Sequence, residues 1–163
     1  MMGPIARYLA DDHARLAALL TRGATDPAAY ADFRKGLLRH IGMEEKILFP
    51  AAQRARGGEP SPAADRLRLD HGALTALLVP TATPAIRAAL RGILERHNVL
   101  EEGPDGIYVA CERLAGDDGA TLLTSLRAFP EVPVNPHVDS DLIEGATRRA
   151  LARAGYAFED FGV

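Results

Sequence analysis

Two histidines in this sequence are each followed by a glutamate four residues later: His40 by Glu44, and His97 by Glu101. On a helix, residues four apart project from the same face one turn apart, so each imidazole and its carboxylate point the same way. Imidazole suits iron, zinc, copper and nickel, and a carboxylate can bridge two ions and neutralise their charge. The spacing therefore favours a transition-metal site.

The same segments belong to an internal repeat. Residues 12–20 (DHARLAALL) match residues 70–78 (DHGALTALL) at six of nine positions, and residues 37–45 (LLRHIGMEE) match residues 94–102 (LERHNVLEE) at five of nine. The two offsets are 58 and 57 residues, so the order and spacing of the segments agree. The further histidines that the repeat places in equivalent positions are His13 and His71.

We interpret the two copies as helical hairpins that each supply half of a dinuclear metal site. A single histidine on an apolar helix face is more often a core or surface residue than a ligand. Four histidines in equivalent places, two of them with a glutamate one turn on, instead require a shared partner, because unpaired buried ionisable groups are costly. Facing helices of a bundle commonly build such sites. The predicted ligands are His13, His40, Glu44, His71, His97 and Glu101.

Apolar periodicity, capping residues and breakers predict the elements that position these ligands. Four helices are expected over residues 5–20, 26–56, 61–80 and 83–114. Pro50 should bend or end the second helix, and the Gly103–Gly106 stretch should kink the fourth. Beyond them we expect a short helix at 121–129, an extended proline-rich stretch at 130–136 and an amphipathic helix at 139–154.

Composition indicates an all-α protein, since alanine and leucine dominate the apolar residues while aromatic and β-branched residues are sparse. With 163 residues, one compact domain is expected. We assign residues 1–115 to a four-helix bundle and residues 116–163 to a C-terminal helical extension packed on it.

Net charge and cysteine content limit which binding partners and which cellular compartment we expect. The net charge is −3 with both signs interspersed, which argues against nucleic acid as a partner. The sequence shows neither a signal peptide at its start nor an apolar stretch able to span a bilayer, so we expect no membrane partner. The lone Cys111 cannot form an internal disulfide and fits a reducing compartment. We expect a cytoplasmic protein.

Other residues able to do chemistry are weaker candidates. Glu45 and Glu102 match across the repeat but lie one residue round the helix from the ligands, so we interpret them as supporting or surface groups. His137 lies outside the repeat and is expected in a loop, and Cys111 is expected to be a buried, inert thiol. The tyrosines that could line a pocket or simply pack are Tyr8, Tyr30 and Tyr108.

This pattern resembles the hemerythrin-like proteins, specifically the bacterial HHE cation-binding domains. The resemblance covers roughly residues 1–115 and rests on DDH (11–13), HIGMEEKILFP (40–50), LDHG (69–72) and RHNVLEE (96–102). It implies an up-down-up-down four-helix bundle around two iron ions joined by an oxo or hydroxo bridge, with zinc or manganese as possible substitutes. It further implies one iron on His13 and His40, the other on His71 and His97, and bridging by Glu44 and Glu101.

One departure from the oxygen-carrying hemerythrins bears on function. Those proteins have a fifth histidine one turn from the third-helix histidine, whereas the positions four away from His71 are Leu67 and Thr75. The pattern is closer to four-histidine, two-glutamate members that resemble iron–sulfur-repair and nitric-oxide-response proteins. A missing ligand implies an open coordination position.

The resulting hypothesis is a non-haem di-iron protein that binds or senses O2 or NO, or handles iron. The expected walls of an apolar pocket for the diatomic ligand are Leu9, Leu16, Ile41, Leu48, Leu74, Leu94 and Leu100. Two alternatives remain open: a di-iron redox enzyme or iron donor for cluster repair, and a regulatory module that uses residues 116–163 to contact a protein partner. The sequence identifies no catalytic residue and no particular partner.

Overall fold

The computed structural model describes residues 2–162, and every regular element within them is helical, which confirms the all-α class. A π-helical turn, η1 (Glu44–Leu48), joins α2 to α3, and 3-10 turns form η2 (Gly116–Asp118) and η3 (Phe158–Phe161). The α-helices are α1 (Pro4–Arg22), α2 (Pro27–Met43), α3 (Phe49–Ala55), α4 (Ala64–Leu77), α5 (Pro84–Glu102), α6 (Ile107–Ala115), α7 (Gly119–Arg127) and α8 (Asp141–Arg153).

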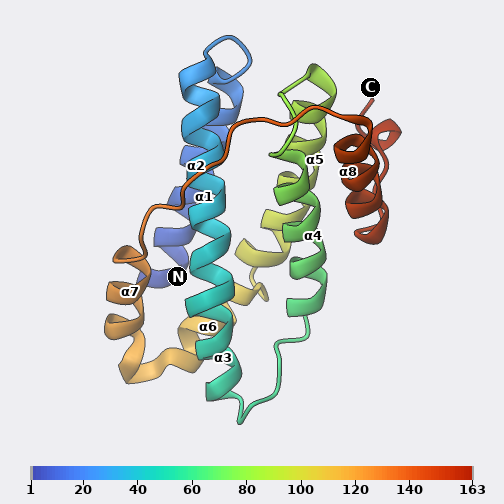
Figure 1. The fold of residues 1–163 in the computed structure, drawn as a ribbon. Helices are drawn as coiled ribbons and strands as arrows, with labels where there is room; N and C mark the ends of the chain where they lie inside the picture. The colour runs from blue at the N-terminus through green and yellow to red at the C-terminus, as the bar shows by residue number, and fades with distance from the viewer. Residues whose placement is uncertain (1, 163) are drawn as a thin grey trace.

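The long helices lie side by side around a shared interior (Figure 1). Helix α1 packs along α2 and also contacts α5, and α4 packs along α5. Helices α3, α6 and α7 gather at one end of the molecule, whereas α8 lies against α4 and η3 against α5. Among the described residues, no helix is both long enough and apolar enough to cross a membrane.

Two of the predicted helix starts are confirmed by their caps. The Asp26 carboxylate accepts hydrogen bonds from the backbone N–H groups of Ala28 and Ala29, and the Thr83 hydroxyl accepts one from Ile86. Each cap is followed by proline, whose missing N–H costs nothing at this position. The predicted start at residue 61 is wrong by three residues: residues 62 and 63 form a turn, and α4 begins at Ala64 without a side-chain cap.

As predicted, the first part of the second helical segment ends before Pro50: α2 stops at Met43, and α3 begins at Phe49 after η1, without a gap between them. In place of a break, the helix widens by one residue, and the Phe49 N–H donates to the Glu44 carbonyl, five residues back. This wider turn accommodates a proline that has no N–H to donate and would crowd the preceding turn. The irregularity therefore begins at a predicted metal ligand.

The fourth helical segment is interrupted at the equivalent place in the repeat. Helix α5 ends at Glu102 and α6 begins at Ile107, so the break starts one residue after Glu101, in the stretch whose glycine and proline content predicted it. At Gly106, a Cβ atom would lie 2.3 Å from the Glu101 carbonyl oxygen, so only glycine permits this close approach. Both hairpins thus depart from a regular α-helix at or just after a candidate bridging glutamate.

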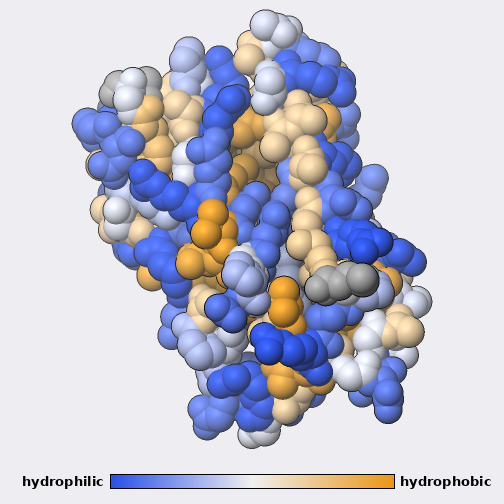
Figure 2. All heavy atoms as spheres, turned by 180° about the vertical axis from the view of Figure 1, so that it is seen from behind, coloured by the Kyte–Doolittle hydropathy of each residue, from blue (hydrophilic) through white to orange (hydrophobic). Residues whose placement is uncertain are grey.

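Two clusters of apolar side chains form the interior, one on each side of the candidate ligands. The first centres on Phe33, Leu77 and Leu90, and the second on residues such as Leu48 and Ile107. In α1, Leu9 belongs to the second cluster and Leu16 to the first, and His13 lies between them. Seen from behind, the surface is mostly hydrophilic with separate apolar patches (Figure 2). The ligands therefore occupy a polar layer inside an otherwise apolar interior.

Residues 128–140 connect α7 to α8 by crossing the face of α2 (Figure 1). Two arginines of α2 hold this segment. Arg39 donates to the Phe129 carbonyl at 2.9 Å, and buried Arg34 donates to the carbonyls of Leu78 and Asn135, at 2.8 and 3.0 Å respectively from its Nη2 atom. These bonds satisfy backbone acceptors at the end of α4 and along the crossing segment.

Replacing Arg34 by methionine should therefore destabilise the protein, because it leaves the carbonyl of buried Leu78 unpaired and removes the bond to the Asn135 carbonyl. We expect a loss of about 2–3 kcal/mol in the free energy of unfolding, measured by urea denaturation. Arg22→Met is the matched control, because Arg22 is 66% exposed and its only ion pair, with Asp26, spans 3.7 Å; its loss should be below about 1 kcal/mol. Equal losses in the two variants would contradict the assignment.

Candidate metal centre

The structure brings all six predicted ligands together in the interior. His13 comes from α1, His40 from α2 and His71 from α4, while Glu44 begins η1. The remaining two, His97 and Glu101, lie one turn apart on α5, and none of the six is more than 6% exposed. Their ligand atoms form two groups, each within 4.8 Å, and the groups share both glutamates: His13, His40, Glu44 and Glu101 in one, and Glu44, His71, His97 and Glu101 in the other.

We call His13 with His40 the first half-site and His71 with His97 the second half-site. Each glutamate presents one carboxylate oxygen to each of them. Glu44 Oε1 lies 3.4 Å from His40 Nε2, and its Oε2 lies 3.1 Å from His71 Nε2. Glu101 Oε2 lies 3.3 Å from His13 Nε2, and its Oε1 lies 3.0 Å from His97 Nε2. This is the arrangement in which two carboxylates can bridge two ions.

The other ring nitrogen of every histidine donates to an outer carboxylate. The four Nδ1-to-oxygen distances are 2.5 Å for His13 to Glu102, 2.8 Å for His40 to Asp12, 2.7 Å for His71 to Glu45 and 3.3 Å for His97 to Asp70. A carboxylate only accepts, so Nδ1 carries the proton and Nε2 is the atom directed at the centre. Such bonds orient metal-binding imidazoles and raise their basicity.

These outer contacts follow the repeat and cross between helices. Asp12, next to His13, holds His40, and Asp70, next to His71, holds His97. Neighbouring residues on a helix point about 100° apart, so the residue beside a ligand reaches a different helix. The role of the two aspartates was not predicted, although the repeated Asp-His dipeptide is a visible signal in the sequence. Glu45 and Glu102, considered there as supporting or surface groups, complete the set.

Tyr108 lies at the centre of the first half-site. Its hydroxyl donates to Glu44 Oε1 at 2.5 Å and lies 3.1 Å from His13 Nε2 and 3.2 Å from His40 Nε2. Burial and the nearby charges of Glu101 and Glu44 raise the pKa of this phenol well above its usual value. The sequence offered Tyr108 only as one of three pocket-lining tyrosines, because nothing in the repeat corresponds to it.

The second half-site has no such group among the described residues. Glu44 Oε2 lies 3.1 Å from His71 Nε2, and Glu101 Oε1 lies 3.0 Å from His97 Nε2, yet these three buried atoms, Glu44 Oε2, His71 Nε2 and Glu101 Oε1, form no hydrogen bond of good geometry. Phe49 stacks on the His71 ring, with 6.1 Å between centroids and 7° between planes. Buried polar atoms without partners are rare and costly, and imidazole and carboxylate are good ligands for a transition-metal ion. The donor set and these unpartnered atoms therefore fit a metal.

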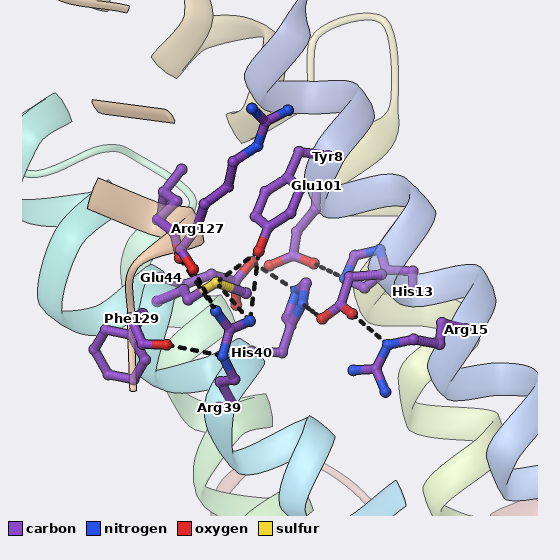
Figure 3. A network of polar contacts seen from close by, with 12 residues as sticks. Tyr8, His13, Arg15, Arg39, His40, Glu44, Glu101, Arg127 and Phe129 are labelled. Carbon is purple, nitrogen blue, oxygen red and sulfur yellow. Dashed lines mark hydrogen bonds and ion pairs between the residues drawn. The ribbon is translucent and has the colours of Figure 1, made fainter. Parts of the chain in front are cut away.

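The other residues considered from the sequence, Tyr8, Tyr30 and His137, belong to neither ligand group. Tyr8 contacts Arg39, whose guanidinium points to backbone carbonyls at the end of α7, beside the ligands (Figure 3). Tyr30 packs on Phe33 and is stacked with the exposed His137, which lies in the crossing segment. Seven apolar residues were predicted to line the pocket. The prediction is wrong for Leu100, which is 41% exposed, whereas the other six are buried.

Cys111 is buried, and its thiol is not exposed for chemistry. Desolvation, together with the charges of Glu44, Glu101 and Glu112, raises its pKa to about 12. A thiol with this pKa stays protonated at neutral pH, and a protonated thiol is a poor nucleophile and a poor metal ligand. The expected burial of Cys111 is confirmed, and its raised pKa agrees with an inert thiol.

Without metal, the charges of the centre are balanced by protons. Burial acts to lower the pKa of His40, but the charge of Glu44 and hydrogen bonds to Asp12 and Glu44 outweigh it and raise the pKa to about 10. In the same way, the charge of Glu101 and the bond to Asp70 raise the pKa of His97 to about 10. Burial acts to raise the pKa of Glu44, yet His40 and His71 hold it well below its ordinary value.

The metal-free protein should consequently lose stability in alkali. Because the folded pKa of His40 and His97 is about 10 and the ordinary value is 6.5, their contribution is complete below pH 6.5 and is lost as the pH rises through 10. Asp12, with a pKa of about 2 against 3.8, contributes above pH 3.8 and loses this as the pH falls through 2. Melting temperatures in chelator should peak between about pH 4 and 6.5. An unchanged melting temperature from pH 6.5 to 10 would contradict this.

Comparison with known proteins gives no match to this chain among protein families, curated proteins or solved structures. The interpretation of the centre therefore rests on its own geometry and on the sequence pattern.

Proposed function

We propose that this protein is a di-iron protein of the hemerythrin-like kind, built on an up-down-up-down four-helix bundle, that binds O2 or NO. His13 and His40 would hold one ion, His71 and His97 the other, and Glu44 and Glu101 would bridge them. One observation carries the proposal: each buried glutamate offers one oxygen to each half-site, at 3.0–3.4 Å from all four Nε2 atoms. Zinc or manganese could occupy the same ligands.

Charge supports two cations at this place. Two carboxylates at 0% exposure are costly in a low-dielectric interior unless positive charge accompanies them. Two divalent ions would provide that charge and would displace the protons that the histidines hold without metal. The four outer carboxylates would then keep each imidazole neutral at Nε2 and aligned with its ion. The buried, unpaired Cys111 suits the reducing cytoplasm, where ferrous iron is available.

A bound ferrous pair supplies electrons and an open coordination position to a small diatomic molecule. The chain provides the surroundings. Leu9, Leu48 and Leu74 are fully buried beside the ligands and exclude water, which protects the site from side reactions. Because the Tyr108 hydroxyl lies 3.1 Å from His13 Nε2 and 3.2 Å from His40 Nε2, it would itself take a coordination position of an ion held there, so we place the diatomic molecule at the second half-site.

Metal content is the most direct test. Protein loaded anaerobically with ferrous iron and freed of excess metal should contain two ions per chain. His97→Ala should retain about one, because only the first half-site keeps both imidazoles. His137→Ala is the control: this histidine is exposed and outside the cluster, so two ions should remain. Wild-type protein that binds no iron would overturn the proposal, as would equal loss in both variants.

The reaction of the ferrous protein with O2 or NO tests whether the centre binds a diatomic molecule. Addition of O2 or NO to the ferrous protein should produce a new charge-transfer absorption band that metal-free protein does not show. The absence of a new band with either gas would contradict diatomic binding while leaving metal binding intact.

The Tyr108→Phe variant tests where the gas binds. Loss of a hydroxyl at the first half-site should leave the NO-induced band in place, with NO affinity within about threefold of wild type, because the second half-site is unchanged. His97→Ala, which keeps Tyr108, should lose the band. The opposite result in this matched pair would move the diatomic molecule to the first half-site.

A further inference from the structure

Asp70 is the outer carboxylate that links the metal centre to the C-terminal end of the chain. It is 1% exposed on α4, and its Oδ2 accepts from His97 Nδ1 at 3.3 Å, the longest of the four outer contacts. Its Oδ1 accepts from Arg66 Nη2, one turn earlier on the same helix. The orientation of the Asp70 carboxylate toward His97 therefore depends on where the Arg66 guanidinium is held.

The residues that follow α8 fix this guanidinium. The same Arg66 nitrogen donates at 2.7 Å to the carbonyl of Ala154, which caps α8, and the guanidinium carbon lies 5.5 Å from the centre of the Tyr156 ring. Burial acts to raise the pKa of Asp70, but hydrogen bonds from His97 and Arg66 lower it. Arg66 therefore contacts both Asp70, the carboxylate that supports His97, and a segment that lies over 80 residues away in the sequence.

The clamping segment is itself docked firmly on the second hairpin. Leu151 and Ala154 are buried in the first apolar cluster, which also contains Leu74 and Leu90 of α4 and α5. A Cβ atom at Gly92 would meet the Phe161 ring at 2.4 Å, so α5 carries glycine where this ring lies. The docked residues 141–162 therefore cover the helices that bear His71 and His97, and they have no counterpart in the repeat.

The first hairpin lacks an equivalent clamp. Asp12, which holds His40, is paired with Arg15 at 2.7 Å, but Arg15 lies on the same helix as Asp12 and is 48% exposed. The described contacts of Arg15 include none with the C-terminal segment. The two half-sites thus share the chain of arginine, aspartate and histidine and differ in whether the C-terminal segment holds the arginine.

We propose that Arg66 and Tyr156 are positioning residues through which the docked C-terminal segment orients Asp70 and His97, so that docking of this segment and metal binding at the second half-site stabilise each other. This rests on the proposed function. Such coupling is reciprocal. The free energy by which docking of the segment strengthens metal binding at His97 equals the free energy by which metal binding strengthens docking.

The test uses the full-length chain with Arg66→Met, and with Arg15→Met as the matched control. Calorimetric titration of metal-free protein with ferrous iron under anaerobic conditions should show two affinities. The affinity that is lost in His97→Ala belongs to the second half-site. Arg66→Met should weaken that affinity by about 10–100-fold and leave the other within about threefold, since supporting residues typically have effects of this size. Arg15→Met should leave the second half-site within about threefold.

Hydrogen exchange measures the coupling in the opposite direction. Adding iron to wild-type protein should increase the protection of amides in residues 141–162 more than that of amides in α7, and Arg66→Met should abolish this difference while Arg15→Met preserves it. If Arg66→Met undocks the segment outright, Tyr156→Leu, which removes only the ring beside the guanidinium, should still lower the second-site affinity, and Arg66→Lys should restore part of it.

The outcomes separate this inference from the proposed function. Wild-type protein that binds no iron removes the proposed function. Wild-type protein that binds two ions, together with an Arg66→Met variant whose affinities and metal-dependent protection are unchanged, removes only the role of Arg66 and the C-terminal segment.

Discussion

The placement of two carboxylates with no solvent exposure is the constraint on which the rest of the molecule depends. Glu44 and Glu101 lie between four imidazoles and within an otherwise apolar interior. Their burial requires compensating positive charge, supplied by protonated histidines without metal and, in the proposed function, by two cations. The arginines of the centre do not supply it directly: Arg15, Arg66 and Arg68 pair with the outer carboxylates Asp12, Asp70 and Glu45. Charge therefore alternates outward from the centre, with carboxylates inside, imidazoles around them, and carboxylates with arginines beyond.

This layering explains why the hairpins must pack on each other. Each glutamate contacts histidines of both half-sites, and the outer carboxylates beside His13 and His71 hold the imidazoles of the neighbouring helices. No hairpin can satisfy its own polar groups alone, so the polar layer aligns the helices as the two apolar clusters pack around it. The helix irregularities serve the same layer, since η1 starts at Glu44 and the break after α5 starts just after Glu101.

The sequence predicted most of this through periodicity. Equal spacing in two copies was enough to group six distant residues, because helices convert sequence spacing into position along a common axis. The features it did not predict depend on contacts between elements. Asp12 and Asp70 stand in plain view beside His13 and His71, but their targets lie on other helices. Tyr108 has no counterpart in the first copy, where Ala51 stands 57 residues earlier. The wider helical turn before Pro50 arises from the backbone, and no side-chain pattern marks it.

The departures from the repeat are what make the two half-sites different. A purely symmetric site would present two equivalent positions, yet Tyr108 occupies the space between the first pair of histidines while Phe49 stacks on the second. The C-terminal segment adds a further difference, since it holds Arg66 and through it Asp70, but leaves Arg15 exposed. Both differences distinguish the half-sites in the same way: the first has its own hydroxyl group from Tyr108, whereas the second has no such group among the described residues and is supported by the C-terminal segment. In the proposed function, such a site would bind two ions with shared bridges and reserve one of them for a small ligand.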